Sequence, residues 1–512
     1  FVDMKVPLRQ LADELTHTGT AVESVSGEGD GAVFEMEITT NRVDAMNHYG
    51  VAREVSAIYD LDLKPYAPKL PAAKPGAAFP ILIEEAELCA RYTARAIRGV
   101  KIGPSPEHIQ QRLALLDSSS ISNAVDASNY TLQEMGHPTH AFDLDLLEGG
   151  KIIVRKARTG EMVKTLDGVE RKLTADDLVI ADAKRPVALA GIMGGFDTMI
   201  TERTKNVLIE SAWFDPTSVR RTARRLGMHT DASHRFERGA DWAATPVACA
   251  RVAQLILEWA GGELTAPESD CVARKIERPA LQLSRSELLR ILGQEIPATD
   301  VERILRRLGF VLEPDRTSKE RRNDYVVRVP TWRLDVEREI DLIEEVARIF
   351  GFNNFKNTLP SFSGAVRELP EAAKDSRTKS TLLALGYDEA ISMTFISAAD
   401  AKRFASAEAV PLENPLSEET AVMRDSLLPG MLDTLAHNLN RGRSDVRLFE
   451  MGNVFELNGA KTQEAKQLAM GATGNAVEAG PHQAARAYTF FDLKGTVEQL
   501  LGNFEHSSVY FD

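Results

Sequence analysis

Five prolines fall within the seventeen residues KPYAPKLPAAKPGAAFP at 64–80. Proline lacks a backbone N–H and disfavours the interior of helices and sheets, so this composition predicts an extended spacer. The chain therefore does not form one continuous core, and its 512 residues suggest roughly three to five domains. We expect an N-terminal α+β domain at residues 1–63, followed by the linker at 64–80.

Beyond the linker, strand-like runs and helix signals mix without an internal repeat. The helix signal DPTSVRRTARRLGM begins at a capping aspartate, Asp215, and stops at Gly227. Capping-box patterns at Ser284 and Thr299 each precede an apolar helical run. The fold class expected is multidomain α+β, with a mixed α/β module at 81–272, a small helical, winged-helix-like domain at 273–358 and an antiparallel sheet domain at 359–512.

Composition narrows the class of protein. Hydrophobic residues make up 43% and charged residues 27% of the chain, as in soluble globular domains. No apolar run reaches the roughly 18 residues needed to span a bilayer, and no signal peptide opens the sequence, so we expect a cytoplasmic protein without membrane contact. Cys89, Cys249 and Cys271 are too widely spaced for a disulfide framework or a zinc site. With a net charge of −14, any nucleic-acid contact must be a local basic patch.

The stretch WRLDVEREIDLIEEVARIFGF at 332–352 gathers acids on one predicted helix. Asp341, Glu344 and Glu345 stand at i, i+3 and i+4 and share a face, and Asp335 lies just before the helix. Like charges at this spacing repel, and a hard cation with oxygen ligands, such as Mg²⁺, would relieve that repulsion. The alternative is a solvated acidic face paired with nearby arginines, namely Arg333, Arg338 and Arg348. Spacing alone leaves both interpretations open.

A second group of polar residues and glycines lies between 137 and 240. His140 stands in HPTHAFDLD, Gly194 in GIMGG, Glu210 at the expected end of the strand LIESAWF, and Thr230 and Ala232 in GMHTDASHRFERGAD. Together they can form a pocket that binds an amino acid and hydrolyses an ester at an RNA end, beside arginines that meet phosphates. These arginines are Arg220, Arg221, Arg224, Arg225, Arg235 and Arg238. The alternative is a set of unrelated structural roles, since nothing in the sequence brings the segments together.

Motifs for other chemistry are missing from the sequence. It contains no GxSxG, HExxH or CxxC pattern, and GIMGG lacks the spacing of a dinucleotide-binding loop. A Walker A loop is also missing, so ATP chemistry by this chain alone is unsupported. A free-standing metal hydrolase that uses the acidic helix is disfavoured, because no base or nucleophile accompanies those acids.

Over nearly its whole length the chain resembles the β subunit of bacterial phenylalanyl-tRNA synthetase. The resemblance rests on segments in family order, among them MEITTNRVDAMNHYGVAREV, HPTHAFDLD, LAGIMGGFDT, RRLGMHTDASHRFERGAD, VPTWRLDVEREIDLIEEVARIFGF and MRDSLLPGMLDTLAHNLNR. It implies an α2β2 ligase that joins phenylalanine to tRNA(Phe) with ATP as substrate, the aminoacylation site being in the α subunit. The β chain would then supply scaffold, tRNA contacts and proofreading.

The resemblance also implies roles for the two groups of residues. The family's magnesium ligands, shared with the α subunit, match Asp335, Asp341, Glu344 and Glu345. Residues 81–272 resemble an editing domain that hydrolyses tyrosine mischarged onto the tRNA. In its pocket, His140 and Glu210 are the catalytic candidates, and Gly194, Thr230 and Ala232 bind the substrate. Glu210 would accept the tyrosine hydroxyl, and His140 would orient a water or bind the terminal adenosine.

The resemblance implies that residues 359–512 form a class II synthetase-like domain without an active site. Glu450 is kept from the family's ATP-binding motif, but the pattern around it is degenerate. We expect this domain to pack on the α subunit. Two departures from the family predict weak tRNA binding. An OB-fold insert is missing from the N-terminal region, and the C-terminal RNA-binding domain would lie beyond residue 512. The chain lacks an initial Met, so we expect its true start to be missing, and it stops abruptly at SSVYFD, so we expect its C-terminal part to be missing too. The alternative to an editing subunit is a pure scaffold in which editing has decayed.

Overall fold

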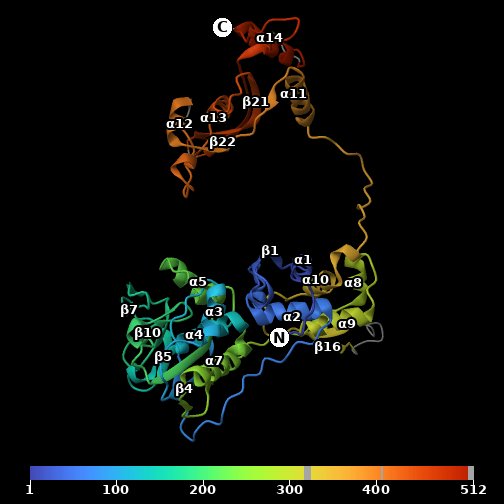
Figure 1. The fold of residues 1–512 in the computed structure, drawn as a ribbon. Helices are drawn as coiled ribbons and strands as arrows, with labels where there is room; N and C mark the ends of the chain where they lie inside the picture. Colours follow the sequence, from blue (N-terminus) through green and yellow to red (C-terminus); the bar gives the residue numbers. More distant parts are fainter. Residues whose placement is uncertain (316–323, 405–407, 460, 505–512) are drawn as a thin grey trace. The chain divides into compact units, whose positions relative to one another are not determined.

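The computed structural model describes residues 1–315, 324–404, 408–459 and 461–504, and divides the chain into two compact units (Figure 1). The first unit is Phe1–Thr358 and the second is Leu359–Asp512. Helices and several small sheets occur in both, so the expected α+β class is confirmed. Among the described residues, no helix is both long and apolar enough to cross a membrane.

The first unit opens with a two-stranded hairpin flanked by two helices. Strand β1 (Ala21–Ser26) pairs antiparallel with β2 (Val33–Glu37), so the chain passes directly from one strand to the next. Helices α1 (Leu8–His17) and α2 (His48–Tyr59) bury Leu11, Leu15 and Val55 against the hairpin. Residues 64–80 contain no helix or strand, as the proline-rich composition predicts.

Two sheets packed face to face form the middle of the first unit. One sheet has the order β13-β4-β12-β5, with β14 also pairing with β4, and the other has the order β11-β10-β9-β6-β3. The strands of the first sheet are β4 (Cys89–Arg98), β5 (Thr139–Asp143), β12 (Asn206–Phe214), β13 (Glu263–Leu264) and β14 (Ser269–Val272). Those of the second are β3 (Ile81–Ile83), β6 (Ile152–Lys156), β9 (Leu178–Ala181), β10 (Pro186–Leu189) and β11 (Met193–Gly194).

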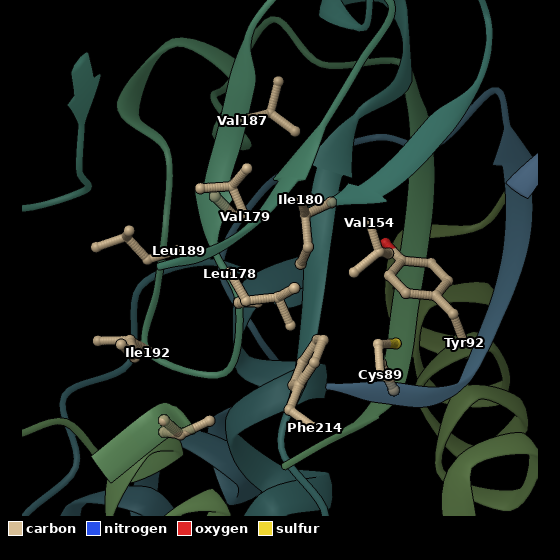
Figure 2. Packing of buried hydrophobic residues seen from close by; sticks show 14 of the residues in the cluster. Cys89, Tyr92, Val154, Leu178, Val179, Ile180, Val187, Leu189, Ile192 and Phe214 are labelled. Atoms are coloured by element: carbon tan, nitrogen blue, oxygen red, sulfur yellow. The ribbon is translucent and has the colours of Figure 1, made fainter. Parts of the chain in front are cut away.

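Alternation along β12 decides which side chains face the second sheet. Val207 and Ile209 pack against the helices on the outer face, whereas Leu208 and Ala212 join the core between the two sheets. Figure 2 shows this core, with Val154, Ile180 and Phe214 inside it. Helices α4 (Asn123–Met135) and α7 (Thr245–Ala260) contact this outer face, and α3 (Glu107–Leu115) precedes α4 in the chain. Glu210 stands two positions from both Leu208 and Ala212 along the strand, so its side chain points to the same inner face.

Two short helices follow β12. Helix α5 (Pro216–Arg225) begins at Asp215, whose side chain accepts the Ser218 N–H at 2.8 Å, as the sequence predicts. Helix α6 (Asp231–Phe236) begins at Thr230. A small hairpin of β7 (Met162–Lys164) and β8 (Glu170–Lys172) lies beside β10.

The described residues in the rest of the first unit form a three-stranded sheet with three α-helices. Its strands are ordered β15-β17-β16 and pack with α8, α9 and α10 around Leu288, Ile304 and Val346. The bounds are β15 (Leu281–Leu283), α8 (Arg285–Leu292), α9 (Ala298–Arg307), β16 (Val311–Pro314), β17 (Tyr325–Arg328) and α10 (Glu339–Phe350). Ala57 of α2 belongs to the same core, which joins this module to the N-terminal one.

The second unit is built on a long hairpin packed with helices. Its sheet has the order β18-β21-β22, and Phe449 and Tyr387 are buried in its core. The helices are α11 (Ala372–Ala384), α12 (Ala398–Phe404), α13 (Leu428–Leu439) and α14 (Phe490–Leu501). The strands are β18 (Asp388–Glu389), β19 (Phe395–Ile396), β20 (Val422–Met423), β21 (Val446–Asn458), β22 (Lys461–Thr473), β23 (Asn475–Val477) and β24 (Arg486–Ala487).

Candidate functional site

Strand register brings the two predicted catalytic residues together. Glu210 of β12 stands directly opposite His140 of β5 in an antiparallel pair, so both side chains project from the same face of the sheet. Glu210 lies in the middle of β12, not at its end as the sequence suggested. The mid-strand position encloses the carboxyl between the two sheets, and only 6% of Glu210 is exposed.

The Glu210 carboxyl has one protein hydrogen bond among the described residues. The Tyr92 hydroxyl donates to Oε2 across 3.2 Å, and Tyr92 is itself fully buried on β4. Burial disfavours the charged carboxylate and raises the pKa of Glu210 to about 8, even though the hydrogen bond from Tyr92 acts in the opposite direction. The group is therefore mostly a neutral carboxylic acid at pH 7.

His140 lies beneath Gly194. The ring stands edge-on to Phe142 with centroids 4.5 Å apart, and its Nε2 atom is buried without a hydrogen-bond partner. A Cβ atom at Gly194 would collide with the ring, so glycine is required here by the close approach of β11 to β5. Burial lowers the pKa of His140 to about 4, so the imidazole is neutral at pH 7 and one ring nitrogen can accept a hydrogen bond.

Thr230 and Ala232 reach this region from α6. The Thr230 hydroxyl donates to the Ile192 carbonyl at 2.8 Å, two residues before Gly194, and accepts the Ser233 N–H as the helix cap. Ala232 packs against the core that contains Tyr92. Thr230 also lines a crevice of about 1330 Å³ against the N-terminal module, whereas Glu210, His140 and Gly194 do not line it. The structure thus brings Glu210, His140 and Gly194 together, joins Thr230 to the neighbouring Ile192, and sets Glu210 and His140 back from this crevice.

The arginines predicted to form one patch divide into two kinds. Arg225 binds the buried Asp177 at 2.5 Å, and Arg235 and Arg238 pair with acids of their own segment. Arg220, Arg221 and Arg224 are exposed and make no hydrogen bond or ion pair within the part of the chain that the structure describes. These three residues, the α5 basic face, leave positive charge on the helix that leads directly to Thr230.

The four predicted metal ligands have separate environments. Glu345 is buried at 2% exposure, and its carboxylate accepts from Arg333 and, at 2.6 and 2.7 Å, from Arg348. Asp335 receives two hydrogen bonds of 2.9 Å from Arg333. Asp341 caps α10 by accepting the backbone N–H groups of residues 337 and 338. Glu344 is exposed.

This arrangement does not fit a magnesium ion held by all four acids. Mg²⁺ needs several oxygens directed at one point about 2.1 Å away, and the lone pairs of three of these carboxylates already accept hydrogen bonds. Within residues 1–315, 324–404, 408–459 and 461–504, no group of three or more His, Cys, Asp or Glu residues could hold a metal ion. The alternative interpretation is confirmed in its arginine pairing, because Arg333 and Arg348 bind Glu345 and Arg338 lies 3.5 Å from Asp341, but Glu345 is buried and not solvated.

Glu345 instead belongs to a buried charge network that joins two modules. Arg348 of α10 also binds Glu54 of α2 at 2.5 Å, and Glu54 binds Arg42 at the same distance. Burial opposes ionisation of Glu345, but attraction to Arg348 and the hydrogen bonds from both arginines hold its pKa well below the usual value. The sequence did not single out Glu54 or Arg42, because both are distant from the acidic helix along the chain.

In the second unit, the predicted remnant of an ATP site is an internal ion pair. Glu450 is 2% exposed and accepts from Arg424 at 2.6 Å and from the Ser392 hydroxyl at 2.7 Å. A carboxylate satisfied in this way stabilises the domain interior.

Three family models match successive parts of the chain: B3/4 domain at residues 88–261, tRNA synthetase B5 domain at 281–352, and phenylalanyl tRNA synthetase beta chain CLM domain at 355–512. The chain is 40% identical over 495 residues to the phenylalanine–tRNA ligase beta subunit of Geobacter metallireducens. It is 41% identical over 501 residues to that of Carboxydothermus hydrogenoformans. These alignments cover 94% and 96% of this chain, but 60% and 62% of the relatives. The chain thus spans about three fifths of their length.

Proposed function

Because the chain belongs to the family of phenylalanine–tRNA ligase β subunits, we propose that it acts as one subunit of a ligase that attaches phenylalanine to tRNA(Phe) with ATP. Its partner is an α subunit, which carries the aminoacylation site in an α2β2 assembly in the cytoplasm. The order of the three matched domains supports this proposal. In the second unit, the apolar side chains Ile391, Leu416 and Phe491 are at least 78% exposed, as suits a surface covered by a partner.

The module built on the two packed sheets is an editing domain in this proposal. It hydrolyses the ester that links tyrosine to tRNA(Phe). The observation that carries the proposal is the buried Glu210 carboxyl beside His140 and Gly194. Tyrosine differs from phenylalanine by one hydroxyl, and a polar group in apolar surroundings favours the ligand that offers it a partner.

In the hydrolytic step, a water attacks the ester carbonyl carbon and the ribose oxygen leaves with a proton. Neutral His140 accepts a hydrogen bond from that water and so holds it in line with the carbonyl. Glu210 keeps the phenol of the tyrosyl group in place at the other end of the amino acid. Neither residue forms a covalent bond to the substrate.

The test is hydrolysis of Tyr-tRNA(Phe) and Phe-tRNA(Phe) by the assembled ligase. Replacing Glu210 with alanine is expected to slow Tyr-tRNA(Phe) hydrolysis roughly tenfold to hundredfold, the value of one hydrogen bond to a buried carboxyl. Aminoacylation should not change, because that site lies in the partner. The matched control is Glu263→Ala, which removes an exposed glutamate from β13 of the same sheet. Equal hydrolysis by wild type and Glu210→Ala would favour the scaffold alternative.

The α5 basic face supports binding of the tRNA backbone. Arg220, Arg221 and Arg224 have no acidic partner within the described ranges, although the chain carries a net charge of −14. Replacing all three with glutamine is expected to weaken tRNA binding by the ligase and to reduce the slope of log affinity against log salt concentration by about 2–3. A control triple variant at three arginines of α8 and α9 that pair with acids of their own helix (Arg290, Arg303 and Arg306) should keep the wild-type slope. Equal slopes for both variants would contradict the assignment.

A magnesium ion shared with the α subunit stays a prediction. The chain's own four acids do not fit such an ion as a set, so no step of the proposed reactions is assigned to it.

A further inference from the structure

Tyr92 belongs to the core between the two sheets. It is fully buried and lies in Figure 2 beside Cys89 and Val154, both also fully buried. On β4 it stands opposite Ala212, two positions along from the residue opposite Glu210. Such diagonal neighbours in antiparallel strands share a face, so the phenol extends toward the Glu210 carboxyl.

A hydroxyl at this point needs a polar partner. In a core of aliphatic and aromatic side chains, phenylalanine would pack as well without the cost of removing a hydroxyl from water. The partner of the Tyr92 hydroxyl is Oε2 of Glu210, at 3.2 Å. The other carboxyl oxygen, Oε1, accepts no hydrogen bond from any described residue. One oxygen is therefore held by Tyr92, whereas the other has no hydrogen-bond partner among the described residues.

We propose that Tyr92 is a positioning residue that fixes the Glu210 carboxyl so that Oε1 is presented to the phenol of a tyrosyl group. This inference rests on the proposed editing function. Glu210 then binds two phenols at once, the permanent one of Tyr92 and the transient one of the substrate. Without the hydrogen bond from Tyr92, the carboxyl can rotate about its terminal torsion angle, which has a broad energy minimum. Oε1 would then point toward the substrate phenol for less of the time.

Tyr92 also affects the protonation of Glu210. Its hydrogen bond stabilises the carboxylate and opposes the effect of burial, so removal of the hydroxyl is expected to raise the pKa of Glu210 further. The other titratable groups that interact with the carboxyl are Cys89, Cys249 and His140. Burial holds all three in their neutral forms, so none replaces the contribution of Tyr92.

The experiment uses Tyr92→Phe in the assembled ligase, with Tyr-tRNA(Phe) as substrate. The KM for its hydrolysis is expected to rise about three- to tenfold, the effect of one modest hydrogen bond, while kcat stays within about twofold. The pH profile of kcat/KM should move to higher pH. The matched control is Tyr387→Phe, which removes a buried hydroxyl that contacts Tyr488 at 2.6 Å in the second unit.

The outcomes separate this inference from the function on which it rests. Unchanged KM and pH profile in Tyr92→Phe, with hydrolysis lost in Glu210→Ala, would overturn the role of Tyr92 alone. Unchanged hydrolysis in Glu210→Ala would overturn the editing function. A loss in Tyr92→Phe that appears only in kcat, or that Tyr387→Phe reproduces, would show a general structural effect and also overturn the positioning role.

Discussion

Replacing Glu345 with alanine is expected to lower the free energy of unfolding of the first unit by about 3–5 kcal/mol. The carboxylate is 2% exposed and lies between Arg333 and Arg348, which are themselves 3% and 5% exposed. Its removal leaves two buried guanidinium groups short of negative charge, and a buried unpaired charge costs more than the original pair contributed. Thermal and urea unfolding of wild type and variant, followed by circular dichroism, measure the difference.

The adjacent residue provides a control for that prediction. Glu344 lies on the same helix but is exposed, and Glu344→Ala is expected to change the unfolding free energy by less than about 0.5 kcal/mol. A chelator should leave the wild-type unfolding curve in place, because arginines supply the positive charge around Glu345. Equal destabilisation by the two substitutions, or a chelator effect as large as that of Glu345→Ala, would contradict the network interpretation.

The acidic helix shows where a local pattern stops being informative. The sequence predicted the helix correctly, and helical spacing correctly aligned Asp341 with Glu345. Spacing does not report what packs against that face, however. Here it is α2, whose Glu54 reaches Arg348 from 294 positions away in the sequence. Whether an acid is solvated, metal-bound or paired with arginine depends on such distant contacts, which one helix does not encode.

Helix ends give a similar contrast. Asp215 was predicted to cap α5 and does so, because aspartate before proline leaves few other conformations for the chain. Thr299 was predicted to cap a helix, but α9 begins one residue earlier and has Pro297 at its cap position. Ser284 stands at the start of α8, yet its hydroxyl contacts Ser286 and its N–H donates to Glu339 of α10. Tertiary contacts replaced the local capping box.

The five residues of the candidate site were grouped from the sequence as one possible pocket, and the family resemblance assigned their roles, whereas Tyr92 was not singled out at all. Its relation to Glu210 depends on the pairing of β4 with β12, whose interacting residues are 118 positions apart. Nothing in the run ARYTARAIRGV distinguishes a tyrosine that contacts a carboxyl from one that only fills the core. Only the strand register reveals that the two side chains share a face.

The same pairing leads to a large effect of pH on stability. Burial raises the pKa of Glu210 to about 8 in the folded protein, against the ordinary value of 4.5 expected after unfolding. Between these pH values the folded state holds a proton that the unfolded state releases. Stability should therefore fall as pH rises from about 4.5 to about 8, and this contribution should be level above and below that window.

Glu210→Gln isolates this contribution, because glutamine keeps the shape of the side chain but does not titrate. A difference of about 3.5 between the two pKa values corresponds to an effect on the order of 5 kcal/mol. Relative to Glu210→Gln, the wild type should thus lose stability between pH 5 and pH 9, as measured by urea unfolding at each pH. Other titrating groups cancel in that comparison as long as they do not contact the site. Glu263→Gln, at an exposed position of the same sheet, should follow the wild-type curve.

Parallel curves for wild type and Glu210→Gln would mean that Glu210 is hydrated in the folded protein, which contradicts the enclosed carboxyl described above. If the stability of the wild type relative to Glu210→Gln falls as pH rises, the carboxyl is held in apolar surroundings, at a cost to the free energy of unfolding above pH 8. That cost has a use in the proposed reaction, since a carboxyl in apolar surroundings discriminates a phenol from a bare ring more sharply than a fully hydrated one does. The pH dependence of unfolding therefore tests the physical basis of the selectivity without any tRNA present.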